Sequence, residues 1–582
     1  MNPRAVIRTG MNLTFQRFLE WIDRWGFGAA CVGSSGAHWM RSGMHILRTQ
    51  AAGENGLIQG MAPHLRRVMK LLQRQCLKDR WRSWVLANLS LLVLTLLFCV
   101  GSCPRTLAAD DGLRTVFPEE DSSAVLHNPD MGWVVYENYP VDPDPHGSST
   151  MLGLPDEHFP DVDVVAVMFS WADIEKREGV YDFDAVDRAY DYWKKRGKSI
   201  QLRSSTESLV WWATRSPPAG TGIPEHVLGG IDPLQKQVRN MEGIPYVVVD
   251  ARNVHYQRRL AIFLKQVAQH FARERPVTLV DLRGFGVWGE WHTGFQYPDM
   301  EGRRAGLKKV LDIWAAAFPD DRLALSYSYD PDGPKALYAG SNRVLDPTST
   351  GSYPQFLRYS AFDHGLKFKN VTFRRDGCGG AVHSNERKLN EEAFRKGRAP
   401  MFSEFAGGYA NARQGGSNWV TWVVEDALSL HPNYINLLGW QGGDARDFAR
   451  ERPDLVARGL RTMGYRLVPV RISYPRRIVA GKRFEILFEW QNRGVGRALR
   501  DFELQVFARG KAGALEVAGS QVLPTSRWVA GGSYTATYRG RFDRASDVLG
   551  GVSFVLRDPV SGRRIALPLK RAVGESQYPI GM

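Results

Sequence analysis

The sequence has few cysteines and lacks the motifs that identify several common enzyme classes. Of its five cysteines, four lie in the first 103 residues, and only Cys378 remains in the rest of the chain. A disulfide framework and a CxxC metal site are therefore excluded there. No GxGxxG follows the first expected strand, no GxSxG joins a strand to a helix, and no HxH or HExxH pattern has a convincing third ligand. A dinucleotide site is disfavoured, serine-based hydrolysis is excluded, and a mechanism without metal or cofactor is favoured.

Positive charge is concentrated in one part of the chain. The formal net charge is +15, but residues 1–83 carry thirteen Lys and Arg against four Asp and Glu, a net of +9 that leaves +6 for the other 499 residues. We find no zinc-finger spacing and no basic stripe with interleaved aromatics that would follow a phosphate backbone. The charge therefore indicates a basic leader, and nucleic acid is not an expected partner.

The leader, residues 1–110, contains the uncharged segment 84–100, WVLANLSLLVLTLLFCV, preceded by a cluster of basic residues. A basic region, an apolar core and small residues after it are typical of a secretion signal, with cleavage expected near Ala109. The remaining chain is then exported, to the periplasm, the cell envelope or the medium. Two alternatives stay open, an uncleaved anchor and acylation of Cys103, and only they would join the protein to a membrane. Met69 is an alternative start.

Residues 117–463 alternate short apolar runs with amphipathic stretches, which favours a parallel α/β architecture. The expected strands are 132–139, 164–171, 199–206, 279–291, 322–329, 366–373, 400–406 and 434–440, the sixth being poorly defined. The expected helices are 184–196, 254–273, 303–318, 386–396, 419–430 and 444–463. Eight such repeats fit a (β/α)₈ barrel, with the largest insertion at 209–250. A doubly wound open sheet is the alternative.

Residues 464–575 contain only strand patterns, among them RFEILFEWQN and GVSFVLRD, separated by turn signals such as Ala480-Gly481 and Gly531-Gly532. Short alternating runs of this kind predict an immunoglobulin-like β-sandwich behind the barrel. It contains no pattern of catalytic residues and is expected to be accessory.

Two glutamates stand where the strands of such a barrel carry reactive groups. Glu290 ends the fourth run, in GVWGEWH, and Glu404 ends the seventh, in MFSEF. Loops at the carboxyl ends of barrel strands converge on one mouth, and strands four and seven lie roughly opposite each other there. Two carboxyl groups facing one sugar ring can cleave a glycosidic bond, one as acid and the other as nucleophile.

Residues 169–184, FSWADIEKREGVYDFD, resemble the stretch after the second strand of β-galactosidase-type glycoside hydrolases of clan A. The resemblance spans about residues 125–570. Over this range the chain is similar to an uncharacterised bacterial group of that clan. It implies an acid/base role for Glu290, a nucleophile role for Glu404 and an aromatic floor at Trp440. The clan has asparagine directly before the acid/base, whereas this chain has Gly289.

Further side chains are expected to bind substrate, because sugar rings stack on indoles and their hydroxyls need polar partners. Arg203 near Glu404 would also favour the ionised form of that carboxylate. The expected binding residues are Arg203, Glu207, Trp171, Trp211, Trp288, Trp291, His292, Tyr329 and Trp440.

Two functional hypotheses follow. The first is an exported glycoside hydrolase that cleaves β-linked poly- or oligosaccharides by a retaining mechanism with two glutamates. The second is a non-catalytic protein for carbohydrate binding or exopolysaccharide assembly on a degenerate hydrolase barrel, for which Gly289 is the argument, because a fold does not guarantee an activity.

Overall fold

The computed structural model describes most of the chain after the leader. The described residues are 112–138, 161–206, 222–241, 244–272, 275–286, 289–291, 297, 300–326, 360–379, 386–405, 408–437, 444–509, 515–543, 551–572 and 576–580. The expected signal segment 84–100 lies outside them, within a unit, Met1–Ala109, that is separate from Asp110–Met582. Within the described part, no helix has the length and apolarity needed to cross a membrane.

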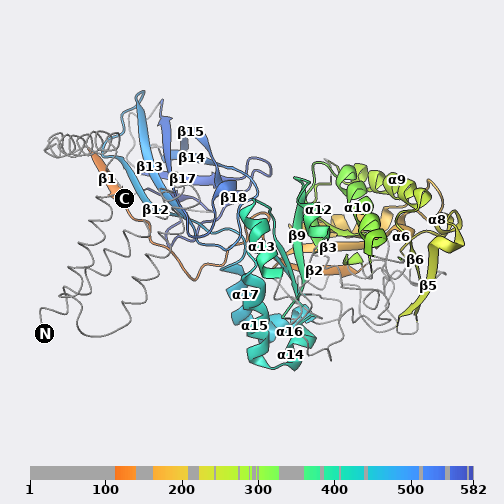
Figure 1. Cartoon of the computed structure of the whole chain (residues 1–582). Coiled ribbons are helices and arrows are strands. Elements are labelled where there is room, and N and C mark those ends of the chain that lie inside the picture. Colours follow the sequence, from red (N-terminus) through yellow and green to blue (C-terminus); the bar gives the residue numbers. More distant parts are fainter. Residues whose placement is uncertain are drawn as a thin grey trace, which may run out of the picture. The chain divides into compact units, whose positions relative to one another are not determined.

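Eight parallel strands close into a barrel, so the predicted (β/α)₈ fold is confirmed (Figure 1). The order around the barrel follows the chain, and the eighth strand pairs with the first. The strands are β2 (Gly132–Asn138), β3 (Val162–Ser170), β4 (Ser199–Ser205), β7 (Leu279–Arg283), β8 (Leu323–Ser326), β9 (Val371–Cys378), β10 (Phe402–Phe405) and β11 (Tyr434–Asn436). The expected fourth strand therefore ends early, at Arg283, and a turn follows it.

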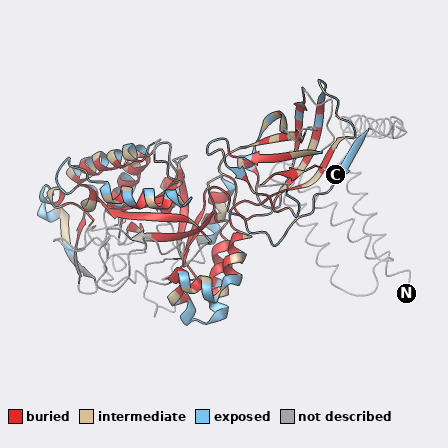
Figure 2. Ribbon diagram, turned by 180° about the vertical axis from the view of Figure 1, so that it is seen from behind, coloured by how far each residue is buried: buried red, intermediate tan, exposed pale blue. Residues whose placement is uncertain are grey.

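The strands form because both of their faces are buried (Figure 2). Successive side chains of a strand point to opposite sides, so one set fills the lumen while the other packs under the helices. In β3, for example, Val165 and Val167 belong to the large outer core, whereas Val164 and Ala166 belong to the lumen core. The lumen core is apolar, and its members are Val134, Tyr136, Val164, Ala166, Met168, Leu279, Ala324, Phe402 and Tyr434.

The expected helices lie close to where the sequence pattern places them, whereas the short helices α6, α8, α12 and α14 were not predicted. They are α6 (Trp171–Ile174), α7 (Asp184–Lys195), α8 (Glu225–Gly229), α9 (Val254–His270), α10 (Met300–Ala317), α12 (Ser360–Gly365), α13 (Glu386–Arg395), α14 (Gly408–Gln414), α15 (Ser417–Leu428), α16 (Asp444–Glu451) and α17 (Pro453–Leu460). The expected helix 444–463 is divided in two because Pro453, at the first position of α17, has no N–H to continue α16.

The sixth strand begins five residues later than the sequence pattern indicated, at Val371. Leu366 and Phe368 pack on the outer core just after α12. Their N–H groups still donate to carbonyls three or four residues earlier, as in a helix. Periodicity alone did not distinguish this helix end from a strand. The insertion after the third strand contains α8 and an antiparallel hairpin, β5 (Lys236–Met241) and β6 (Ile244–Val249).

Two antiparallel sheets follow the barrel in the sequence, which is consistent with the predicted β-sandwich. One contains β1 (Leu113–Val116), β12 (Leu467–Pro475), β13 (Arg483–Asn492) and β16 (Ser533–Arg541). The other contains β14 (Phe502–Arg509), β15 (Leu515–Leu523), β17 (Val552–Arg557), β18 (Arg564–Ile565) and β19 (Tyr578–Pro579). Residues of both sheets form one core, in which Phe488 of β13 meets Phe554 of β17 at 5.3 Å between ring centroids. Strand β1 precedes the barrel in the chain and was not predicted to join this sheet.

Candidate active site

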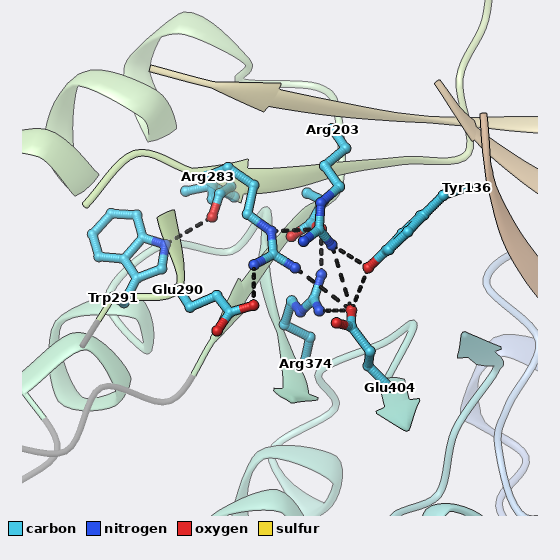
Figure 3. A network of polar contacts seen from close by, with 9 residues as sticks. Tyr136, Arg203, Arg283, Glu290, Trp291, Arg374 and Glu404 are labelled. Carbon is cyan, nitrogen blue, oxygen red and sulfur yellow. Dashed lines mark hydrogen bonds and ion pairs between the residues drawn. The ribbon is translucent and has the colours of Figure 1, made fainter. Parts of the chain in front are cut away.

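A polar layer lies in the barrel lumen near the carboxyl ends of the strands (Figure 3). Five strands contribute to it: β2 with Tyr136, β4 with Arg203, β7 with Asp281 and Arg283, β9 with Arg374, and β10 with Glu404. Each of these residues occupies the lumen-facing position of its strand, and all are buried. Every second side chain of a strand points into the lumen. The apolar side chains occupy one such position, and the polar ones occupy the next lumen-facing position along the strands.

Side chains from four strands surround one carboxyl oxygen of Glu404. Its Oε2 accepts a hydrogen bond from the Tyr136 hydroxyl at 2.5 Å and another from Arg374. Arg203 lies 3.4 Å and Arg283 3.5 Å from the same oxygen. Hydrogen bonds and positive charges aimed at one oxygen favour the ionised form. The expected neighbourhood of Arg203 and Glu404 is confirmed.

Tyr136 is a hydrogen-bond donor to this carboxylate. Burial raises the pKa of Tyr136 well above its ordinary value of 10, and Glu404 raises it further, although the neighbouring Arg203 acts in the opposite direction. The phenol therefore keeps its proton. The Arg203 guanidinium also lies over the Tyr136 ring, 4.4 Å from its centroid, which fixes the orientation of both side chains.

Asp281 contacts all three arginines of the layer. Its Oδ2 is 3.1 Å from Arg203 and 3.0 Å from Nε of Arg283, and it also accepts from Arg374. Among the described residues, the layer contains three carboxyl groups, those of Asp281, Glu404 and Glu290, and three guanidinium groups. Burial of charges is costly unless partners and hydrogen bonds compensate it, and these contacts contribute to that compensation.

Glu290 reaches the layer through a tight turn after β7. The N–H of Gly289 donates to Gly286 and that of Trp291 donates to Phe285, so the chain folds back on the end of the strand. Gly289 has φ +68°, and a Cβ there would lie 2.6 Å from the backbone of Arg283. This turn has no room for the asparagine of the clan. Glu290 is the more accessible glutamate, with 18% of its side chain exposed against 2% for Glu404.

A single guanidinium group connects the two glutamates. Arg283 contacts Glu290 Oε1 through Nη1 at 2.9 Å and Glu404 Oε2 through Nη2 at 3.5 Å (Figure 3). These contacts and the width of a guanidinium group set an upper limit of about 9 Å on the separation of the two carboxylate oxygens. This limit allows both the separation of about 5 Å found in retaining glycosidases and the separation of about 6.5–9.5 Å found in inverting ones.

Two of the expected sugar-binding tryptophans are buried away from any ligand. Trp171 has 0% exposure, stacks on Phe263 of α9 and donates through Nε1 to Glu175 at 2.7 Å. Trp291, also 0% exposed, donates to the carbonyl of Leu282, and its ring points away from the glutamates (Figure 3). The burial of both contradicts the prediction that they contact a sugar. The other expected residues, Glu207, Trp211, Trp288, His292, Tyr329 and Trp440, lie outside the described residues.

The motif that carries the family resemblance has a structural role in the described part of the chain. Glu175, fully buried, accepts from Trp171 and from the N–H of Gly179, and it pairs with Arg259 of α9. His226 of α8 lies 3.6 Å from the same carboxylate. Glu175 thereby joins the turn after β3 to the insertion and to α9.

Comparison with known proteins matches only part of the chain. The glycoside hydrolase family 42 model, described as Beta-galactosidase, matches residues 158–282. This segment resembles the β-galactosidases of that family. It includes Arg203 and Asp281 but ends before both glutamates. The resemblance to β-galactosidase-type hydrolases predicted from the sequence is confirmed over this segment.

Among curated proteins, β-galactosidase BbgII of Bifidobacterium bifidum is 48% identical over 58 residues, which are 10% of this chain and 8% of that protein. The chain thus matches less than a tenth of this relative's length. Among solved structures, the β-amylase catalytic domain of Paenibacillus polymyxa is 10% identical with a TM-score of 0.38, covering 55% of this chain and 95% of that one. Xylanase B of Clostridium stercorarium F9 is 11% identical with a TM-score of 0.30, covering 53% and 85%. Structural scores this low support no functional argument.

The charge balance of the layer is testable by a double-mutant cycle. Arg283→Met leaves three carboxyl groups with two guanidinium groups, and we expect it to lower the free energy of unfolding by about 3–5 kcal/mol. Asp281→Asn creates the opposite imbalance, whereas the double variant restores equal numbers. Urea unfolding should therefore show a loss in the double variant smaller than the sum of the single losses by about 1 kcal/mol or more. Additive losses would contradict the balance.

Proposed function

We propose that this protein hydrolyses β-glycosidic bonds by double displacement, with Glu404 as nucleophile and Glu290 as acid/base. The proposal rests mainly on one observation, the contact of Arg283 with both glutamates, one in the turn after the fourth barrel strand and the other at the end of the seventh. The family 42 match supports a β-glycosidase, and the relatives' name makes β-galactosides the first substrates to test.

In the first step, a Glu404 carboxylate oxygen forms a bond to the anomeric carbon while the bond to the leaving oxygen breaks. Glu290 gives its proton to that oxygen. In the second step, water attacks the same carbon, its proton returns to Glu290, and the bond to Glu404 breaks. Each displacement inverts the anomeric centre, so the product retains the configuration of the substrate.

The polar layer suits these two reaction steps because the total charge of its side chains does not change during them. When Glu404 becomes an ester, it loses a negative charge, and Glu290 gains one as it releases its proton. Arg283 contacts both carboxyl groups, so the charge moves between two partners of the same guanidinium group. Fixed charges that need no reorganisation are an efficient means of stabilising such a transfer.

Substitution of Glu290 tests the acid role. Glu290→Gln should slow hydrolysis of an alkyl β-galactoside about 10²- to 10⁴-fold, because its leaving group needs a proton. A dinitrophenyl β-galactoside, whose leaving group does not, should lose much less in its first step. The matched control is Glu489→Gln on β13, a partly exposed glutamate paired with Arg471, which should change neither rate.

Equal losses on both substrates would contradict the acid role of Glu290. If the unsubstituted protein binds galactosides and returns them intact after long incubation, the non-catalytic hypothesis replaces the hydrolase.

We also propose that the barrel and the sheets that follow it are exported. The support is the uncharged segment 84–100 behind the basic residues between Lys70 and Arg82. Sequencing the amino terminus of the protein recovered from an envelope or medium fraction should place it near Asp110. Recovery of the chain with its leader intact in the soluble cell fraction would contradict export.

A further inference from the structure

Two tryptophans on the surface differ from all the others that the structure describes. Trp419 is 42% and Trp422 40% exposed. The seven other described tryptophans are at most 2% exposed, and they are Trp133, Trp171, Trp193, Trp291, Trp314, Trp490 and Trp528. An indole is the largest apolar side chain, so exposing two of them side by side forgoes considerable burial energy. Such a patch marks a binding surface when something on the surface defines its partner.

Helix α15 presents the pair on its outer side. Its buried residues Val420, Val423, Val424 and Ala427 face the barrel. Trp419 and Trp422 are three positions apart, so they are neighbours on one face, and their ring centroids are 4.8 Å apart with 34° between the planes. At Gly415, an added Cβ would lie 2.5 Å from Cγ of Trp419, so the absence of a side chain lets that indole pack against the backbone.

A charged side chain held in place by a partner lies on the same side of α15 as Trp422. One turn beyond Trp422, Glu425 pairs with Arg458 at 2.9 Å. An apolar surface beside fixed charged groups matches a sugar, which has apolar C–H faces and a rim of hydroxyls.

The size of the patch argues against a protein partner. At about 40% exposure, the two indoles together offer at most about 200 Å². A stable interface between protein chains takes about 800 Å² from each partner. The ion pair of Glu425 and Arg458 near Trp422 does not extend the apolar area. A few sugar rings are therefore a better match than a second copy of this chain.

We propose that Trp419 and Trp422 form a second saccharide-binding site on the outer face of α15. The site is remote from the glutamates, because β10 points Glu404 into the lumen while the adjacent Ser403 hydroxyl contacts Ala427 on the inner side of α15 (Figure 1 shows α15). The ligand is a stretch of polysaccharide, held by stacking while another stretch is free to enter the barrel. The choice of β-linked polymers as ligands rests on the proposed function.

Affinity electrophoresis of the full chain tests the proposal. Native gels contain soluble β-1,4-galactan, and the Glu290→Gln background keeps the polymer intact. This protein should migrate more slowly than in a gel without polymer. Adding Trp419→Ala and Trp422→Ala should abolish the retardation and weaken binding at least about tenfold. Trp419→Phe with Trp422→Phe should retain part of it, because phenyl rings still stack.

A second measurement separates this proposal from the proposed function. With Glu290 intact, the double alanine variant should hydrolyse an aryl β-galactoside at the unsubstituted rate, because that substrate needs only the lumen. If the galactan does not retard the Glu290→Gln protein, or retards the double alanine variant equally, the second site is overturned. Self-association in sedimentation experiments that disappears in the double variant would also overturn it, in favour of a contact between copies.

Discussion

The contact of Arg283 with three carboxyl groups is the interaction on which the candidate site depends. Its Nε contacts Asp281, and its two terminal nitrogens contact Glu290 and Glu404. Glu290 comes from a turn and Glu404 from a strand three places away around the barrel. The planar guanidinium group of Arg283, with its nitrogens in a fixed fork, contacts both carboxyl groups.

The barrel makes this arrangement possible because it separates an apolar level of the lumen from a charged one. Side chains such as Val134, Leu279 and Phe402 fill the first level, and the next lumen-facing positions of the same strands are Tyr136, Asp281 and Glu404. Charges placed there are shielded from water on the packed side, which strengthens their interactions. The tight turn at Gly289 then brings Glu290 to the same level while leaving it partly accessible.

Much of the fold follows from the sequence pattern, because buried parallel strands and amphipathic helices alternate clearly. The pattern was misleading in two places. Leu366 and Phe368 resemble a strand but directly follow a helix, and β1 joins a sheet whose other strands begin only at Leu467. Glu404 lies at the end of its strand as the pattern predicts, whereas Glu290 lies in a turn after β7 and not at the end of that strand. The burial of Trp171 and Trp291 could not be predicted, since an indole near a strand end has the same sequence signature whether it is buried or exposed.

Asp281, Arg283 and Arg374 were missed, although a signal was present. Charged residues inside otherwise apolar strand runs, as in LVDLR and VTFRR, have to find partners in the lumen or behind the strand. Arg374 turns inward to Glu404, while its neighbour Arg375 turns outward to Asp426 of α15. Which of the two arginines faces the lumen depends on the register of the strand. The sequence does not fix that register to within one residue, because the start of the sixth strand is poorly defined.

The central claim is that Glu404 attacks the anomeric carbon, and covalent trapping tests it most directly. A 2-deoxy-2-fluoro β-galactoside with a dinitrophenolate leaving group should inactivate the protein, and mass spectrometry of peptides should locate one added fluorogalactosyl group on Glu404. The account is contradicted if protein that hydrolyses the substrate carries the label on another residue. It is also contradicted if the protein releases product of inverted configuration and no label is found.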